Sequence, residues 1–168
     1  MDIQMIPLKQ VNFQVSLAQG FADMVVHQRY VNELDEPVEI QFCMPTGQSF
    51  TVGQIIVDFT LEDGTEERLQ TRIVERERAA EQYEDSQAEG KTAVFATLPP
   101  PSKEYQSESM MKIRLGNMPA NCSAIVRTFC HQKLEVEDFS YCFRLPMAFV
   151  PPYMGNASKA LLDDSSLL

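Results

Sequence analysis

The sequence predicts a mainly β protein: an antiparallel, β-sandwich-like domain with one α-helix at about residues 76–89 packed on it. Two observations lead to this fold class. Apolar and polar residues alternate over several separate stretches, as they do in strands with one buried and one solvated face. Residues 76–89 lack this alternation and are rich in Arg, Glu, Ala and Gln, which favour helix.

The alternation predicts three strands directly. Every second residue is apolar at 11–17, at 38–44 and at 139–145. Pro45 follows the second stretch and Pro146 follows the third. Because proline has no backbone N–H to donate to a neighbouring strand, we expect each proline to end its strand.

Turn residues separate the remaining strands. Asp63-Gly64 lies between strand-like runs at 55–61 and 65–74, and Asp-Gly accepts the positive φ angles of a tight hairpin turn. A further pair of strands, at 111–115 and 123–131, surrounds the turn-like sequence GNMPAN. Gly53, inside another strand-like run, predicts a β-bulge.

The helical stretch carries a narrow apolar face. Ala79, Ala80, Tyr83 and Gln87 recur at three- and four-residue spacing, and Tyr83 is the one large side chain among them. Gly90 follows at the place where a helix end favours a residue without a Cβ atom. We therefore expect the helix to lie on a sheet, with Tyr83 as its anchor, and to lead through Gly90 into another strand.

Length and composition favour one ordinary globular domain. A chain of 168 residues, 44% hydrophobic, buries a sizeable core without help from a metal or a disulfide. No apolar run approaches the roughly 20 residues of a membrane-spanning helix. The first residues lack the basic and then apolar pattern of a secretory signal. We expect a cytoplasmic protein, with a secreted parent as the alternative.

The charge argues against two classes of partner. The net charge is −10, whereas nucleic acid and anionic membrane surfaces both require clustered cations. Between residues 58 and 89, eleven acids face four arginines. Glu81, Glu84 and Asp85 on the predicted helix are thus a possible docking face for a basic partner protein, and a plain solvated face is the alternative.

No group of residues predicts catalysis, a metal site or a cofactor. None of the four cysteines, Cys43, Cys122, Cys130 and Cys142, stands in a CxxC pair, so we expect reduced, separate thiols. Cys130 is adjacent to His131, but neighbouring strand residues point to opposite faces and cannot share one ion. The sequence also contains no phosphate-binding loop, no GxGxxG and no GxSxG.

Five segments of the chain resemble a known family. They are QRYVN (28–32), VEIQFCMP (38–45), RIVERERAAEQYEDSQAEGKTAVF (72–95), IRLGNMPANCSAIVRTF (113–129) and FRLPMAFVPPY (143–153). The motif residues within them are Tyr30, Asn32, Pro45, Ala79, Tyr83, Gly90, Gly116, Asn117 and Pro119. Together they are similar to the VIT domain, the vault protein inter-α-trypsin module of inter-α-trypsin inhibitor heavy chains and the vault poly(ADP-ribose) polymerase.

The resemblance implies a β-sandwich-like domain with one helix, no enzymatic activity and no cofactor. It also implies a von Willebrand A domain as the usual downstream neighbour. On this basis residues 1–155 form the VIT-like domain. Residues 156–168, which are small, polar and unpatterned, are expected to be a linker or a disordered tail before such an A domain.

Three hypotheses about function follow. The first is a non-catalytic interaction or scaffold module that packs against a neighbouring von Willebrand A domain or a partner protein. The second is a small-ligand-binding β-domain, which would contain a sizeable apolar pocket where a scaffold has a packed core. The third is an enzyme, which the absence of any reactive constellation in the sequence disfavours.

Overall fold

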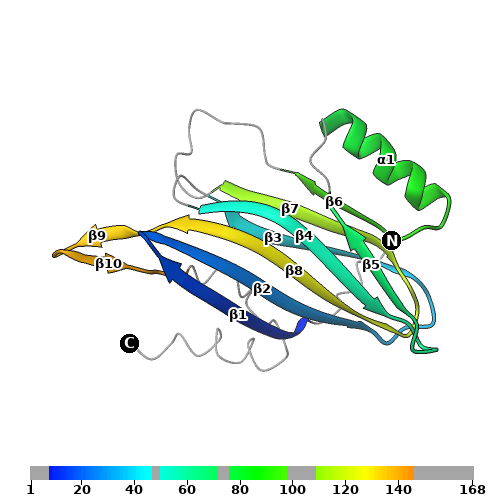
Figure 1. Cartoon of the computed structure of the whole chain (residues 1–168). Helices are drawn as coiled ribbons and strands as arrows, with labels where there is room; N and C mark the ends of the chain where they lie inside the picture. The colour runs from blue at the N-terminus through cyan, green and yellow to red at the C-terminus, as the bar shows by residue number, and fades with distance from the viewer. Residues whose placement is uncertain (1–7, 47–49, 72–75, 98–108, 146–168) are drawn as a thin grey trace, which may run out of the picture.

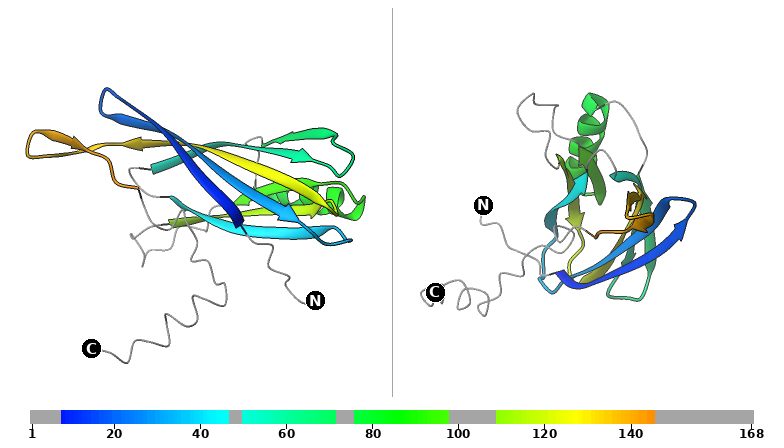
Figure 2. Two further views of the ribbon diagram at one scale, coloured as in Figure 1. Left: turned by 90° about the horizontal axis from the view of Figure 1, so that it is seen from below. Right: turned by 90° about the vertical axis from the view of Figure 1, so that its left-hand side faces the viewer.

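The computed structural model describes residues 8–46, 50–71, 76–97 and 109–145. Within these ranges two antiparallel sheets face each other, and one helix lies over the smaller sheet (Figure 1; Figure 2). The predicted fold class, mainly β and antiparallel with one helix, is confirmed.

The larger sheet has five strands and the smaller has three. The larger runs in the order β1 (Leu8–Ala18), β2 (Phe21–Asn32), β8 (Cys122–Lys133), β4 (Phe50–Thr60) and β5 (Glu66–Gln70). The smaller runs in the order β3 (Val38–Thr46), β7 (Ser109–Met118) and β6 (Ala93–Thr97). A separate hairpin, β9 (Glu135–Glu137) with β10 (Ser140–Cys142), continues from the end of β8.

The core lies between the two sheets and follows from the alternation of the strands. Every second residue is buried along β2, at 122–130 of β8 and at 55–59 of β4, and these residues pack against Ile40, Phe42 and Met44 of β3 and Ile113 and Leu115 of β7. Each of these strands thereby presents a mainly apolar face inward, with Gln28, Asn32 and Thr128 as its buried polar residues, and a mixed face outward.

Two β-bulges change which face of the sheet the following side chains point to. The register of β4 against β8 shifts between Val52 and Ile55, so Gly53 lies in the bulge that its position predicts. In β7, Val38 pairs with Met118 while Ile40 pairs with Leu115, so β7 carries one extra residue there. Met118 consequently points into the core and is fully buried.

Two predicted strand limits are wrong. β3 continues past Pro45 to Thr46, because β3 is an edge strand of the smaller sheet and proline is tolerated at a sheet edge. Residues 139–145 do not form one half-buried strand. The chain turns at Asp138–Phe139 between β9 and β10, and Phe139 is fully exposed.

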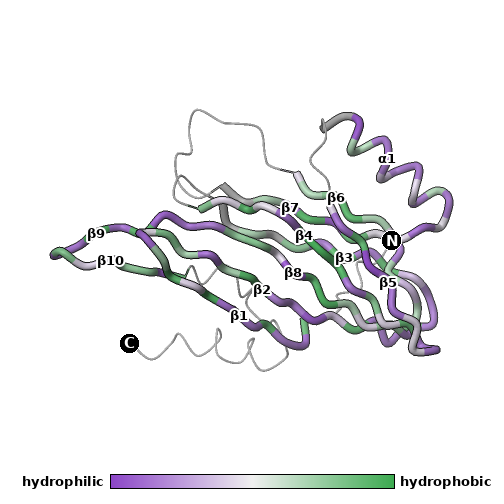
Figure 3. The backbone as a smooth tube through the Cα atoms, viewed as in Figure 1, coloured by the Kyte–Doolittle hydropathy of each residue, from purple (hydrophilic) through white to green (hydrophobic). Residues whose placement is uncertain are grey.

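Helix α1 (Arg76–Ala88) matches the predicted 76–89 almost residue for residue. It is too short and too polar to cross a membrane, and the described ranges contain no other helix. Figure 3 shows α1 as largely hydrophilic, in contrast to the alternating strands beneath it.

Candidate functional site

Most of the motif residues gather in two clusters. One cluster joins α1 to the outer face of the smaller sheet and contains Tyr83, Gly90, Gly116 and Asn117. The other closes a corner between the sheets and contains Asn32 with the backbone of Pro119. We call them the helix dock and the corner.

Tyr83 is the centre of the helix dock. Its side chain is only 3% exposed although α1 is otherwise largely solvated. Its ring lies against Phe95 of β6, with 5.7 Å between the ring centroids, and the Arg114 guanidinium lies 5.0 Å from the Tyr83 centroid. Burial raises the pKa of Tyr83 to about 12, with a further contribution from Glu39, so the phenol stays neutral.

Gly116 provides the space into which Tyr83 fits. A Cβ atom at this position would lie 2.3 Å from Nε2 of Gln87 and 2.5 Å from the Tyr83 hydroxyl. Both distances are shorter than van der Waals contact. A residue without a Cβ atom at this point of β7 therefore allows α1 to approach the sheet closely.

An ion pair borders the dock. Arg114 Nε donates to Glu39 Oε1 at 2.7 Å and Arg114 Nη2 donates to Oε2 at 3.1 Å, which is the bidentate arrangement of guanidinium and carboxylate. Gln87 Nε2 donates both to Glu39 Oε2, at 3.2 Å, and to the Tyr83 hydroxyl, at 3.1 Å. The hydrogen bonds from Arg114 are the main reason that the pKa of Glu39 lies below its ordinary value.

The end of the helix is tied to the same place. Gly90 has a φ of +74°, its N–H donates to the Gln87 carbonyl, and the Lys91 N–H donates to the Ser86 carbonyl. These are the two hydrogen bonds of a Schellman cap. Asn117, itself at a φ of +52°, donates from Nδ2 to the carbonyls of Gln87 and Lys91 at 3.1 Å each. The bulge in β7 thus caps α1.

Asn32 builds the corner and is fully buried. Its Nδ2 donates to the carbonyls of Glu36, Met118 and Pro119, and its Oδ1 accepts from the Leu34 N–H. One amide side chain therefore joins the turn after β2 to the turn after β7. Tyr30, two residues earlier on the same inner face, packs on Phe42 in the core, where burial raises the pKa of its phenol.

The other predicted positions lie apart from these clusters. Ala79 is half-buried on α1, while Glu81, Glu84 and Asp85 are exposed on it. The side chain of Pro45 and residues 156–168 lie outside the described parts of the structure. Sequence reasoning missed Glu39 and Arg114, which are 75 residues apart, because a pairing over that distance leaves no local pattern.

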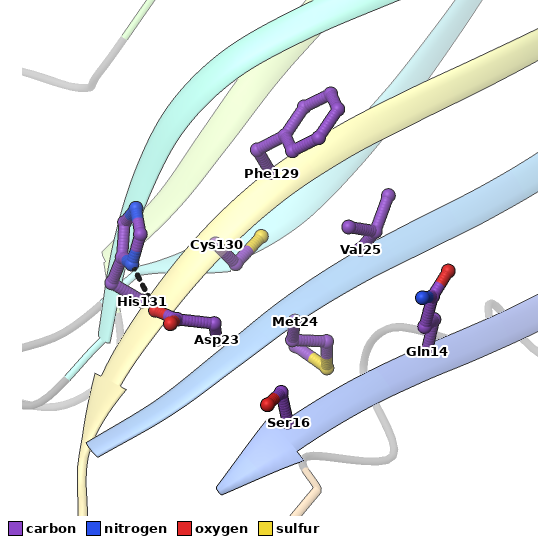
Figure 4. A pocket seen from close by; sticks show the side chains of 8 residues that line it. All are labelled: Gln14, Ser16, Asp23, Met24, Val25, Phe129, Cys130 and His131. Carbon is purple, nitrogen blue, oxygen red and sulfur yellow. Dashed lines mark hydrogen bonds and ion pairs between the residues drawn. The ribbon is translucent and has the colours of Figure 1, made fainter. Parts of the chain in front are cut away.

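Within the described ranges, the side chains that could act as nucleophile, acid or base do not form a catalytic arrangement. His131 Nδ1 lies 2.6 Å from Asp23 Oδ1, and both side chains are solvated (Figure 4). Across the strands Ser16 pairs with Asp23 and Asp23 pairs with His131, so the acid stands between the hydroxyl and the imidazole. A nucleophilic triad needs the histidine in the middle.

The two buried thiols, Cys122 and Cys130, are equally unreactive. Cys122, Cys130 and Cys142 are free, and burial raises the pKa of Cys130 to about 12 and that of Cys122 to about 11. A thiol that stays protonated is a poor nucleophile and a poor metal ligand. No group of three or more His, Cys, Asp or Glu residues in the described ranges is arranged to hold a metal ion.

Neither of two surface hollows in the described ranges resembles a ligand pocket. The hollow in Figure 4, beside Met24 and Cys130, has a volume of about 170 Å³. Drug-sized ligands occupy pockets of about 300–1,000 Å³. A second hollow, of about 570 Å³, is lined by residues 133–137 alone and is therefore open on its other sides. The space between the sheets is filled by the core.

The fold and the two clusters define a β-sandwich domain whose motif residues hold its own parts together. The chain belongs to the vault protein inter-alpha-trypsin (VIT) domain family, whose model matches residues 8–130. A VIT domain is typically a non-catalytic module associated with von Willebrand A-containing proteins. The comparison with curated proteins gives no match.

Proposed function

We propose that this chain is a non-catalytic protein-interaction module that packs against a neighbouring von Willebrand A domain or a partner protein in a larger parent. One observation carries the proposal. The polar groups of Tyr83, Asn117 and Asn32 all bind other residues of the domain, so the motif builds a scaffold. A scaffold of this kind acts through its outer surface. The association of VIT domains with von Willebrand A-containing proteins supports the choice of partner.

The exposed side of α1 is one candidate docking face. Glu81, Glu84 and Asp85 are solvated there, and the whole chain has a net charge of −10. A basic protein surface would complement this face electrostatically. The same charge supports a protein partner over nucleic acid or an anionic membrane.

The proposal includes a cytoplasmic location. The described cysteines Cys122, Cys130 and Cys142 are free thiols, and two of them are buried in the core. Reduced thiols are the ordinary state of cysteine in the cytosol, whereas secreted domains usually pair them.

A binding titration tests the proposal. The isotope-labelled chain is titrated with a von Willebrand A domain taken from a protein in which a VIT domain precedes it, and chemical-shift changes are followed by NMR. A short linker supplies an effective concentration of the order of 1 mM, so an interface that persists within one chain needs a Kd below about 1 mM. An immunoglobulin domain serves as the control β-sandwich. Equal behaviour of the two added domains would contradict the proposal.

A further inference from the structure

One end of the molecule exposes a concentration of large apolar side chains. The β9–β10 hairpin and the β1–β2 turn both project at this end, beyond the facing sheets (Figure 1; Figure 2). Among the described residues, the large apolar side chains exposed at this end are Leu17, Phe21, Val136, Phe139 and Tyr141, and those exposed elsewhere are Val15 and Ile125. Clustered apolar exposure of this kind marks a surface that another molecule covers.

Phe139 is the most unusual residue of this end. It occupies the second position of a two-residue hairpin turn, where Asp138 has a φ of +46° and Phe139 a φ of +63°. The β1–β2 turn has the same form, and there the second position is Gly20 at +82°. Such turns favour glycine at this position, because a bulky residue is strained in the left-handed region.

Nothing in the described domain compensates for that strain. The Phe139 side chain has a relative exposure of 105%, so it makes no packing contact that would hold the residue in place. Strained backbone without a structural benefit is characteristic of positions that serve a function. A fully exposed phenylalanine at a hairpin tip is suited to insert into a pocket of another protein.

Contacts between the two strands support the hairpin that carries Phe139. On one face Arg144 binds Glu135 at 2.7 Å and Glu137 at 2.6 Å, which ties the two strands together. On the other face Val136 pairs with Tyr141. These apolar residues are 65% and 64% exposed.

The base of the hairpin is attached to the body of the domain. The Leu134 N–H donates to the Gly20 carbonyl at 2.9 Å, and a Cβ atom at Gly20 would lie 3.2 Å from the Tyr141 ring. A projecting side chain on a fixed base loses little freedom when it is bound, which favours affinity.

We propose that this end is the surface through which the domain meets its von Willebrand A partner, with Phe139 inserted into an apolar pocket that has a basic rim. The inference rests on the proposed function and adds the location of the interface. The position of the C-terminal end of the described chain supports a von Willebrand A domain as the molecule that binds here. Gln132 Nε2 of β8 donates to the Arg144 carbonyl at 3.4 Å, so the described part of the chain ends beside the base of the hairpin. A domain further along the chain is therefore within reach of this end.

The charge explains the basic rim and argues against two other occupants. Asp138 is adjacent to Phe139 at the tip, whereas Glu135 and Glu137 lie on the other face of the hairpin, where both pair with Arg144. A second copy would bring the same acids together, and two convex tips cannot bury the more than about 1,000 Å² that a stable interface needs. An anionic membrane would repel the same acids.

The test is the NMR titration with the same von Willebrand A domain, using Phe139→Asn. Asparagine tolerates the left-handed region but removes the apolar side chain. We expect affinity to fall about 30-fold, as for an interface hot spot. We also expect the melting temperature to rise by about 2–4 °C, because the strain is relieved. Phe139→Tyr should retain affinity. The control is Ile125→Thr, which removes an exposed apolar residue from the outer face of β8 and should leave affinity unchanged.

Each remaining outcome overturns the inference in a recognisable way. If wild type binds the A domain and Phe139→Asn binds equally well, the interface lies elsewhere and the proposed function stands. If wild type does not bind the A domain at all, both proposals fall. If Phe139→Asn melts below wild type, Phe139 has a structural role and not the role proposed. If wild type binds phosphatidylcholine vesicles and Phe139→Asn does not, the tip is a membrane anchor.

Discussion

At the scale of single residues, a missing side chain matters as much as a present one. Gly116 leaves the space that Tyr83 and Gln87 occupy, and its φ is not in the left-handed region, so the requirement is steric. Gly53 is the matched comparison within the chain. It is also a strand glycine without a positive φ, and the nearest atom to its added Cβ would be a carbonyl oxygen at 3.5 Å, an ordinary contact.

We predict that Gly116→Ala destabilises the domain by about 1–3 kcal/mol, because the new methyl group forces the Tyr83 hydroxyl and the Gln87 amide away from the sheet. Gly53→Ala should change the free energy of unfolding by less than about 1 kcal/mol. Denaturant unfolding of both variants measures the difference. Equal stability of the two would show that α1 does not depend on close approach at Gly116.

Tyr83 should be the main energetic contact of α1. We predict that Tyr83→Ala lowers the free energy of unfolding by about 3–5 kcal/mol, as expected for a buried aromatic. The exposed acids provide the contrast. The double variant Glu84→Ala/Asp85→Ala should change the free energy of unfolding by only about 0.5 kcal/mol. Urea melts of the two proteins beside wild type test the order, and a Tyr83→Ala protein as stable as wild type would refute it.

Local spacing identified some of these residues and missed others. Helical periodicity pointed to Tyr83, and the need for a residue without Cβ pointed to Gly90. Glu39 could be placed on the outward face of its strand, but its partner Arg114 could not, since their pairing depends on how β3 and β7 align. Phe139 was misplaced because the alternation continued through a two-residue turn without any change in its period.

At the scale of elements, α1 makes few apolar contacts with the rest of the domain. It rests on the smaller sheet through Tyr83 and the groups around it, and most of its remaining surface is solvated. Elements held in this way open more easily than core strands. Glu39, which pairs with Arg114 and accepts a hydrogen bond from Gln87 of α1, links this contact to a titratable group.

We predict that protonation of Glu39 loosens α1. Because its pKa is lower in the folded state than the ordinary 4.5, Glu39 contributes stability above about pH 4.5, and this contribution is lost as pH falls through the lower folded value. Asp63, Glu89 and Glu137 also have lowered pKa values, so the comparison has to isolate one group. Melting temperatures between pH 3 and pH 6 should fall less steeply for Glu39→Gln than for wild type. Parallel curves would exclude a contribution from this pair.

The positions of turns, bulges and helix ends were predictable where the sequence has residues with strong local backbone preferences. The hairpin at Asp63-Gly64, the bulge at Gly53 and the helix at 76–88 all follow from local residue preferences. Pro45 was less informative, because whether a proline ends a strand depends on whether that strand lies at an edge. That is a property of the sheet and is not visible in the sequence around the proline.

At the scale of the whole molecule, the net negative charge disfavours binding to DNA and RNA. The chain carries 24 acids against 14 basic residues. In the described ranges several of the basic residues are already paired, among them Arg68 and Arg127 with Asp58, and Arg114 with Glu39. We predict no measurable binding to DNA or RNA at physiological salt. Fluorescence anisotropy with labelled oligonucleotides tests this, and salt-sensitive binding in the micromolar range would contradict it.

The fold class was within reach of the sequence, but the topology was not. Alternation shows that a strand has one buried face, and it does not show which strand lies beside it. The pairing of β2 with β8 joins parts of the chain that are far apart, and it is decided by how well complete faces fit together.

The corner at Asn32 has a kinetic consequence. Its contact with Pro119 spans 87 residues and adjoins the pairing of β2 with β8, so we expect it to form late in folding, together with that long-range pairing. Interactions that form after the rate-limiting step affect the unfolding rate and leave the folding rate nearly unchanged. Asn32→Ala, which leaves buried backbone groups unpaired, should therefore lower stability by about 1–3 kcal/mol almost entirely by faster unfolding. In a stopped-flow chevron its unfolding arm should rise while its folding arm overlays that of wild type, so that Asn32 determines how long a folded molecule survives and has little influence on how quickly it forms.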